Sequence, residues 1–502
     1  MRIILLLALL TLPLSTIAQD NELDLLRQEL AELKRLNAQY VARLGELEDR
    51  LAAVAAAPAE AKPGDPAVPA ERPHGGDPET LAAEPAAAGR FSTGFDPDRF
   101  AYYGYMRAGY GVASDGTKQT RFKAPGAVTA YRLGNETDTY MEPGFSWYHA
   151  SDADDPVFGT HFRLAYSTLD KNTGVALEGD SGVVSLREVY ATARNVVPGQ
   201  PGATLWAGQR YYDSHDIHIN DFMWLDMSGY GAGIEDVDLG FAALAVAWIG
   251  GTTDKFTGRN EYIGELENTD KNNIDVRLKG IDIGIGRASL WLNYSNYRLS
   301  ATELELTRAD GWSGGAWLES ELNPGWTNLA AVQYGTSVAA NFNSFSPSLR
   351  SSIDGEFPQG TRVDDQRRLR LLDAMDFRLN DRWSLQAVAV YQHDDLGLQE
   401  NTDLKWYSLG FRPVYSFNTL YNLAFEAGYD YTDLETGESG GLLKLTAAGE
   451  VTPELGFFSR PALRFYLTWA QWSEEFRGLI GGNTYADDTS GFAVGAQFES
   501  WW

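Results

Sequence analysis

The sequence predicts an all-β transmembrane barrel preceded by an N-terminal α-helical coiled coil. Of its 502 residues, only the first few form a long apolar run, so no spanning helix is available to the mature chain. Such a chain is either soluble or enters a membrane as a closed barrel, the one other architecture that pairs its backbone in lipid. Aromatic-rich segments of about ten residues alternate with Gly, Asn, Asp and Ser clusters as far as Trp502, which favours the barrel.

Residues 1–18 have the features of a secretory signal peptide. Met1 and Arg2 are followed by the apolar run IILLLALLTL and then by small residues ending at Ala18. This run is about half the length of a transmembrane helix, so we expect cleavage and a mature chain that starts near Gln19. Export agrees with the absence of cysteine, which excludes disulfides and thiol-based metal sites or nucleophiles.

Residues 19–54 carry a heptad pattern, which predicts a periplasmic coiled coil. Opposite charges at flanking positions, such as Glu29 with Lys34, favour parallel strands, and Asn37 at a core position would fix the register. A single amphipathic helix lying on another surface is the alternative. The core positions are Leu23, Leu26, Leu30, Leu33, Asn37, Tyr40, Leu44, Leu47, Leu51 and Val54.

Residues 55–92 separate the coiled coil from the barrel. They hold seven prolines among alanines, glycines and charged residues, which predicts a semi-rigid linker. Residues 93–502 are assigned to the barrel. The formal net charge of −28 argues against nucleic acid as a partner, because such binding depends on clustered Lys and Arg.

The last strand gives the clearest local test of the barrel. In GFAVGAQFESWW, alternation places Trp502 on an apolar face and Trp501 on the opposite face, beside Gln497 and Glu499. A chain that ends on an aromatic residue after such alternation is typical of outer-membrane barrels, so the apolar face is assigned to lipid and Trp501 to the lumen. The lipid face is Phe492, Val494, Ala496, Phe498 and Trp502.

Alternation also places aromatic residues beside charged residues in three further segments. These are YYGYMRAGYGV, AYRLGNETDTYME and SRPALRFYLTWAQW. Their predicted inward sets are Tyr105 and Arg107; Arg132, Glu136, Asp138, Tyr140 and Glu142; and Phe458, Arg460, Arg464 and Tyr466.

A lumen lined by rings and charged groups suits a sugar as the solute. A sugar has one apolar CH face, on which rings can stack, and a rim of hydroxyls that carboxylates and guanidinium groups can hydrogen-bond in place of water. The alternative is that these rings belong to the aromatic girdles that every such barrel has at its membrane interfaces.

Five segments, in order and at similar spacing, resemble the maltoporin and sucrose-porin family. They are YRLGNETDTY, LWAGQRYYDSHDIHINDFMW, SGYGAGIEDVDLGF, SRPALR and GAQFESWW. The resemblance extends from about Phe100 to Trp502 and implies an antiparallel barrel of 18 strands, a homotrimer and a lumen narrowed by an inward-folded loop. The sucrose porins also carry a periplasmic coiled-coil extension, which residues 23–54 match.

The resemblance also implies which residues line the path of the sugar. Trp326 is carried over from NPGWTNLAAVQY with a gap of one residue, and Arg187 from SLREVY, where alternation assigns no face. The aromatic row is Tyr105, Tyr140, Trp326, Phe458 and Trp501; the polar track is Arg107, Arg132, Glu142, Arg187, Asp216 and Asp221; and the constriction positions are Ser214 and Met223.

Two departures from the family pattern concern selectivity. Maltodextrin-selective members carry Arg and Tyr at the constriction, whereas Ser214 and Met223 lack that charge and that phenol hydroxyl. The early loop DKNTGVALEGDSG, between Asp170 and Gly182, has no aromatic residue to offer to a neighbouring subunit.

Other chemistry finds little support. His215 and His218 have a spacing that could bind a metal, but a strand would place them on opposite faces, so neither metal nor cofactor is predicted. A hydrolase would need a Ser, His and acid constellation, and no enzyme is predicted. The predicted function is passive diffusion of maltodextrins, sucrose or related carbohydrates through the outer membrane, with the extension in the periplasm. The alternatives are a general porin and a tether between outer membrane and cell wall.

Overall fold

The computed structural model describes residues 98–149, 156–168, 183–252, 269–299, 308–346, 348–349, 362–398 and 403–502. The predicted signal peptide (1–18), coiled coil (19–54) and linker (55–92) lie outside the described residues. None of the helices in the described part of the chain is long and apolar enough to cross a membrane.

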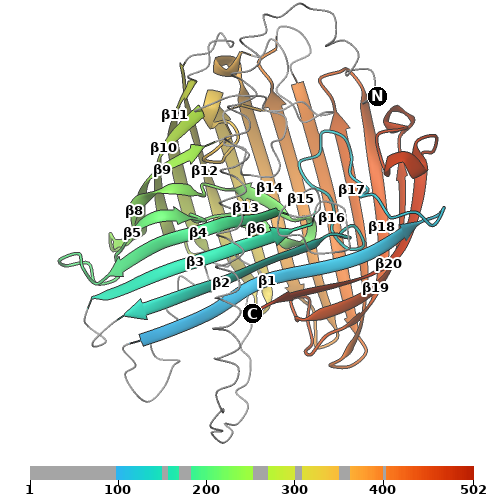
Figure 1. Ribbon diagram of the computed structural model, residues 1–502, viewed down its shortest axis with the longest axis horizontal. Helices are drawn as coiled ribbons and strands as arrows, with labels where there is room; N and C mark the ends of the chain where they lie inside the picture. Colours follow the sequence, from blue (N-terminus) through green and yellow to red (C-terminus); the bar gives the residue numbers. More distant parts are fainter. Residues whose placement is uncertain are drawn as a thin grey trace, which may run out of the picture. The chain divides into compact units, whose positions relative to one another are not determined.

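The described residues form one closed sheet of 18 antiparallel strands, which confirms the predicted barrel. Each strand pairs with its neighbours along the chain, and β20 closes the barrel on β1, with Tyr105 opposite Trp501 (Figure 1). The barrel strands are β1 (Asp98–Ala113), β2 (Thr139–His149), β3 (Val157–Ser167), β4 (Val183–Arg194), β5 (Thr204–Arg210), β8 (Gly229–Asp238), β9 (Ala243–Thr252), β10 (Thr269–Asp282), β11 (Arg287–Leu299), β12 (Arg308–Asn323), β13 (Trp326–Thr336), β14 (Arg367–Arg378), β15 (Trp383–Asp395), β16 (Asp403–Ser416), β17 (Tyr421–Asp433), β18 (Ser439–Val451), β19 (Ala462–Trp472) and β20 (Ser490–Trp501).

The strands alternate between a buried inward face and an exposed apolar outward face, because successive side chains point to opposite sides of a strand. In β19, Phe465 is 69% exposed, whereas Arg464 and Tyr466 on either side of it are buried. The same alternation in β20 exposes Phe492 and Val494. The faces predicted for these two strands are therefore confirmed.

The two ends of the barrel differ in their connections. At the end where β1 begins and β20 finishes, strands are joined by turns such as residues 324–325 and 417–420. We call this the short-turn end, and the opposite one, with connections such as 114–138 and 211–228, the long-loop end. Barrels of this kind place their short turns on the periplasmic side.

The connection between β5 and β8, residues 211–228, folds into the lumen. It contains a two-stranded sheet of β6 (His215–Ile217) and β7 (Phe222–Leu225), joined by the 3-10 turn η1 (His218–Asn220). Arg370 on β14 donates to the Trp224 carbonyl (2.7 Å), and Arg412 on β16 donates to the Ile219 carbonyl (3.1 Å). This inward loop is thus held against the far wall, as the family resemblance implies.

Two further connections fold inward from the long-loop end. In segment 114–138, the Tyr131 hydroxyl lies 2.8 Å from the Ser408 hydroxyl, and its ring occupies the space where side chains at Gly410 and Gly428 would stand. After η3 (Ser337–Ala339), the carbonyl of Asn343 accepts a bond from Lys271 on β10. In the described part of the chain, the other short helices are η4 (Val363–Asp365), η5 (Glu474–Phe476) and η6 (Gly482–Tyr485).

Segment 114–138 corrects one expectation. Alternation was applied to Arg132 and Glu136 as strand residues, but β2 starts only at Thr139, and both residues lie in the inward-folded connection. Their side chains still face the lumen, where Arg132 Nε bonds the Glu136 carboxylate (2.9 Å). The predicted location is confirmed, while the strand that was to produce it is absent.

Candidate functional site

Four of the five predicted rings form a row along one wall of the lumen. Tyr140 stands near the start of β2 at the long-loop end, with its ring 6.1 Å from that of Tyr105 on β1. Tyr105 lies opposite Trp501 of β20 in the strand register. The ring of Trp501 is 6.5 Å from that of Phe458, which lies in the turn before β19. The row therefore extends from the long-loop end to the short-turn end.

Trp326 does not belong to this row. On β13 the buried residues are Ala331 and Gln333, whereas Val332 and Tyr334 are exposed, so alternation places Trp326 on the outward face. Its ring contacts Phe377 on β14 at 5.2 Å. The alignment of this segment with the family needed a gap of one residue. Because successive side chains of a strand point to opposite faces, such a shift moves the predicted position to the other face.

A network of ion pairs lies beside Tyr140 and Tyr105, the rings nearer the long-loop end. Arg107 pairs with Glu136 (3.1 Å) and Asp138 (3.0 Å), and Asp221 of the inward loop lies 3.6 Å away. Arg132 donates to the Tyr105 hydroxyl (2.5 Å) and pairs with Glu499 (2.8 Å). The guanidinium groups here are thus paired with carboxylates, which balance their charge.

Glu499 is a residue that sequence reasoning placed in the lumen without giving it a role. Besides Arg132, it pairs with Arg460 (2.6 Å) and Arg464 (2.9 Å), and it accepts a hydrogen bond from Tyr105 (3.0 Å). Arg460 in turn stacks on Trp501, with its guanidinium carbon 3.9 Å from the ring centroid. In the sequence, the position of Glu499 next to Trp501 on the inward face of the last strand was the sign that it belongs to the site.

Glu142 and Arg187 form a second polar group, on β2 and β4. Glu142 accepts hydrogen bonds from Tyr140 and from Tyr211 (2.9 Å), and Arg187 lies 3.8 Å from it. Alternation could not assign Arg187 because of a β-bulge: Arg163 pairs with Glu188, but the next residue of β3 pairs with Leu186. The extra residue lets Arg187 and Glu188 both face inward.

The inward loop places its predicted residues differently. Asp216 lies on β6 and faces the open lumen, where burial and the neighbouring Asp221 carboxylate raise its pKa to about 7. Met223, its partner on β7, is 45% exposed while Phe222 and Trp224 on either side are buried. Met223 therefore lies at the open surface of the constriction.

Ser214 does not face the pore. It is 3% exposed, and its hydroxyl bonds the Asp226 carboxylate (3.1 Å) and the Ser228 hydroxyl (2.9 Å), which fastens the base of the inward loop. The expectation that Ser214 shapes the constriction surface is therefore wrong. The serine side chain is short, so its hydroxyl bonds groups of its own loop and does not reach the pore.

His218 is a second residue without a predicted role. Its ring nitrogens lie 3.0 Å from Arg132 and 3.0 Å from Arg460, and its ring meets those of Trp501 and Phe458 edge-on at 5.4 and 5.9 Å. Burial and the two guanidinium groups hold the pKa of His218 well below its ordinary value. A neutral imidazole from the inward loop thus borders Trp501 and Phe458, the half of the row nearer the short-turn end. His215 stacks on Trp224 instead.

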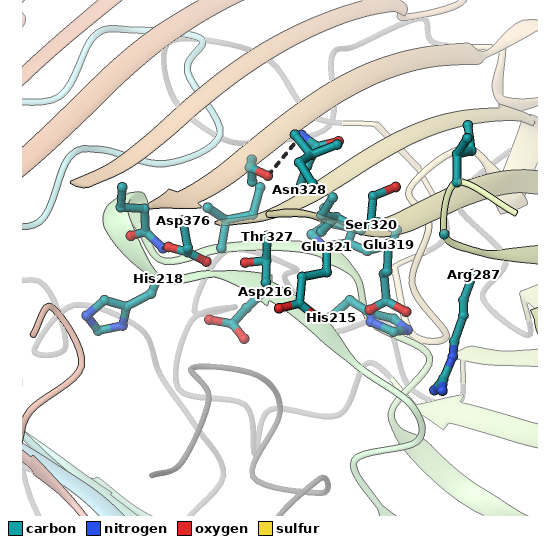
Figure 2. A pocket seen from close by; sticks show the side chains of 18 of the residues that line it. His215, Asp216, His218, Arg287, Glu319, Ser320, Glu321, Thr327, Asn328 and Asp376 are labelled. Atoms are coloured by element: carbon teal, nitrogen blue, oxygen red, sulfur yellow. Dashed lines mark hydrogen bonds between the residues drawn. The ribbon is translucent and has the colours of Figure 1, made fainter. Parts of the chain in front are cut away.

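The inward loop borders a cavity of about 900 Å³ in the lumen (Figure 2). Phe458, His218 and Asp216 line one part of it, and residues of β12, β13 and β14 line another. Among the described residues, no group of three or more His, Asp or Glu side chains is arranged to hold a metal ion.

Solved structures of outer-membrane channels are similar to this chain at low sequence identity. The chain is similar to the outer-membrane channel DcaP of Acinetobacter baumannii, with 12% identity, a TM-score of 0.46 and coverage of 82% of this chain and 100% of that one. It is also similar to Salmonella typhi OmpF in complex with daunomycin, with 11% identity, a TM-score of 0.44 and coverage of 80% and 98%. The LamB porin family matches residues 100–502, and the chain therefore belongs to this family of outer-membrane porins.

Proposed function

We propose that this porin conducts sugars or oligosaccharides, such as maltodextrins or sucrose, by passive diffusion. The observation that carries the proposal is the row of four rings Tyr140, Tyr105, Trp501 and Phe458, which spans the lumen beside paired charges. Rings on the lumenal side have no lipid to anchor, so the girdle alternative does not explain them.

The neighbouring polar groups suit the hydroxyl rim of a sugar. Arg107 and Glu142 carry charged donors and acceptors beside the rings. Hydrogen bonds to charged groups are stronger than neutral ones, yet each is exchanged for a water contact and so leaves a modest net affinity. A series of weak sites allows a solute to move from one to the next.

The assembly and orientation of the protein complete the proposal. We take the functional unit to be a homotrimer in the outer membrane, with the short-turn end and the N-terminal extension in the periplasm. Family membership supports the trimer, and the short turns support the orientation.

Current block in planar bilayers tests the sugar route. We expect neutral oligosaccharides of glucose and of sucrose type to interrupt the ion current in a concentration-dependent way, because a sugar on the rings fills the narrow lumen. A general porin with idle rings would pass ions with no saturable block by any sugar of the panel, and that result would contradict the proposal.

A further inference from the structure

The sulfur chemistry of this protein is confined to its methionines, because the chain contains no cysteine. Of its six methionines, Met1 belongs to the predicted signal peptide, and the structure describes the other five. A thioether is converted to a sulfoxide by oxidants that reach it from water. The surroundings of each sulfur therefore decide which of the five such an oxidant can modify. They are Met106, Met141, Met223, Met227 and Met375.

Four of these side chains are shielded from water. Met106 follows inward-facing Tyr105 on β1 and therefore points outward, and Met141 lies opposite it on β2. Met375 shares the outward face of β14, which alternation separates from the buried inward residues of that strand. Lipid covers the outward face of such barrels. Met227, in the inward loop, is 0% exposed.

Met223 is the exception, because its side chain is 45% exposed and faces the lumen. On β7 it stands between Phe222 and Trp224, which pack on the far wall against Trp406 (5.3 Å) and Trp317 (5.7 Å). Successive side chains of a strand point to opposite faces, so Met223 points away from that wall and into the open pore. Its thioether therefore meets the water and solutes that enter the channel.

The inward loop also holds Met223 beside a hydrogen-bond acceptor. Asp216 on β6 lies directly opposite it in the register, so the two side chains share one face, with Cβ atoms typically about 5 Å apart in such a pair. Figure 2 shows the Asp216 carboxylate directed into the open space. The loop backbone is bonded to the far wall at Trp224 and Ile219. An atom added to the Met223 sulfur therefore stays in the pore.

We propose that Met223 is an oxidation site and that its oxidation tightens sugar binding at the constriction. A peroxide is the co-reactant: the sulfur lone pair attacks one peroxide oxygen, the O–O bond breaks and an S–O bond forms. Hydrogen peroxide leaves as water, so the sulfur loses two electrons and the peroxide gains them. The sulfoxide oxygen is an acceptor beside Asp216, and neighbouring hydroxyls of a sugar can donate to both. The oxidation site stands without the proposed sugar route, whereas its effect on binding rests on that route.

Peptide mass spectrometry tests the site on the full-length wild type in lipid vesicles treated with hydrogen peroxide. The gain of one oxygen atom is followed at each methionine. We expect Met223 to react on the order of tenfold faster than Met227 and the three outward methionines, and all five to react at similar rates after unfolding in denaturant. Equal rates in the folded protein, or a slower reaction at Met223, would overturn the assignment.

Current block by a maltooligosaccharide tests the effect of the oxidation. Peroxide should tighten block of the wild type by about fivefold, as for one added hydrogen bond, and a methionine sulfoxide reductase with a thiol should reverse the change. Met223→Leu is similar in volume but has no sulfur, so its block should be the same before and after peroxide. Met223→Gln places an amide oxygen at this position and should be blocked more tightly than Met223→Leu without any peroxide.

The outcomes separate this inference from the proposed function. An equal response to peroxide in the wild type and in Met223→Leu would assign the effect to another residue, and unchanged or weaker block of the oxidised wild type would show that no such effect exists; either result overturns the inference. No block of the untreated wild type by any sugar would overturn the sugar route, and the predicted effect with it, while the mass spectrum would still decide the oxidation site.

Discussion

At the scale of single residues, the guanidinium groups near the rings are paired with carboxylates. The rings can therefore stack on a solute without an unbalanced charge beside them. The single carboxylate of Glu499 forms ion pairs with Arg132, Arg460 and Arg464. Arg132 also pairs with Glu136 and Arg464 with Glu450, so the guanidinium group that depends most on Glu499 is that of Arg460, which stacks on Trp501. Glu499 therefore keeps the row suited to an uncharged sugar face.

The clearest residue-scale prediction compares the two last tryptophans. Trp501→Ala and Tyr105→Ala should each weaken sugar binding by about 1 kcal/mol, which is about fivefold in Kd, because each removes one stacking ring. Trp502 packs against outward-facing Tyr102 at 5.2 Å, so Trp502→Ala should affect assembly and leave the affinity of inserted channels unchanged. Titrated current block measures both; equal affinities in all variants would contradict the stacking path.

Asp216 gives a pH prediction. Because burial and Asp221 raise the Asp216 pKa to about 7, the group should be ionised at pH 8.5 and neutral at pH 5.5. The permeability of potassium relative to chloride should therefore fall as the pH is lowered across this window, and Asp216→Asn should remove that step. Reversal potentials at several pH values check it, with Asp381→Asn as the control that retains the step. A step that persists in Asp216→Asn would assign it to another group.

Residue-level prediction from sequence succeeded where a strand is regular. Tyr105 and Trp501 were assigned inward by period two alone, and the structure agrees. It gave no answer at Arg187, where a bulge breaks the alternation, and it was wrong at Trp326, where one skipped residue reverses the face. Local sequence contains no mark of either shift.

At the scale of elements, the inward loop determines the narrowest part of the pore. Its backbone is fixed to β14 and β16 by Arg370 and Arg412, and its base by Ser214. Such a loop was expected from family resemblance, not from its own pattern. Its partners stand more than a hundred residues away in sequence, and the same is true of Tyr131 against Gly410 and Gly428. Long-range packing of this kind leaves no periodic signal.

Met223 yields the prediction at this scale. It lies at the open surface of the loop, where a tyrosine would add a hydroxyl and a ring to the sugar path. We expect Met223→Tyr to tighten block by maltohexaose by about fivefold, the effect of roughly 1 kcal/mol from one added contact. Met141→Tyr, on the outward face of β2, is the matched control. Unchanged affinity in Met223→Tyr would show that this position does not limit selectivity.

At the scale of the whole molecule, closure of the barrel was predictable but its strand number was not. Apolar alternation and the aromatic end of the chain indicate a transmembrane barrel, and a barrel leaves no free edge between β1 and β20. Eighteen strands came from family resemblance, since turns and bulges obscure the count in the sequence. The N-terminal heptads remain a prediction.

The last prediction concerns those heptads. If the barrels form a trimer, three linkers meet and raise the effective concentration of the helices, so a parallel three-stranded coil should form even though an isolated peptide of this length is only marginally helical. Because the chain has no cysteine, Leu26→Cys introduces a unique thiol at a core position, and Gln28→Cys places one on the outer side of the same turn. With a trivalent maleimide crosslinker, the intact protein should yield mainly trimers from Leu26→Cys and far fewer from Gln28→Cys. Absence of inter-subunit products, or products that stop at dimers, would contradict the three-stranded coil while leaving the barrel unaffected.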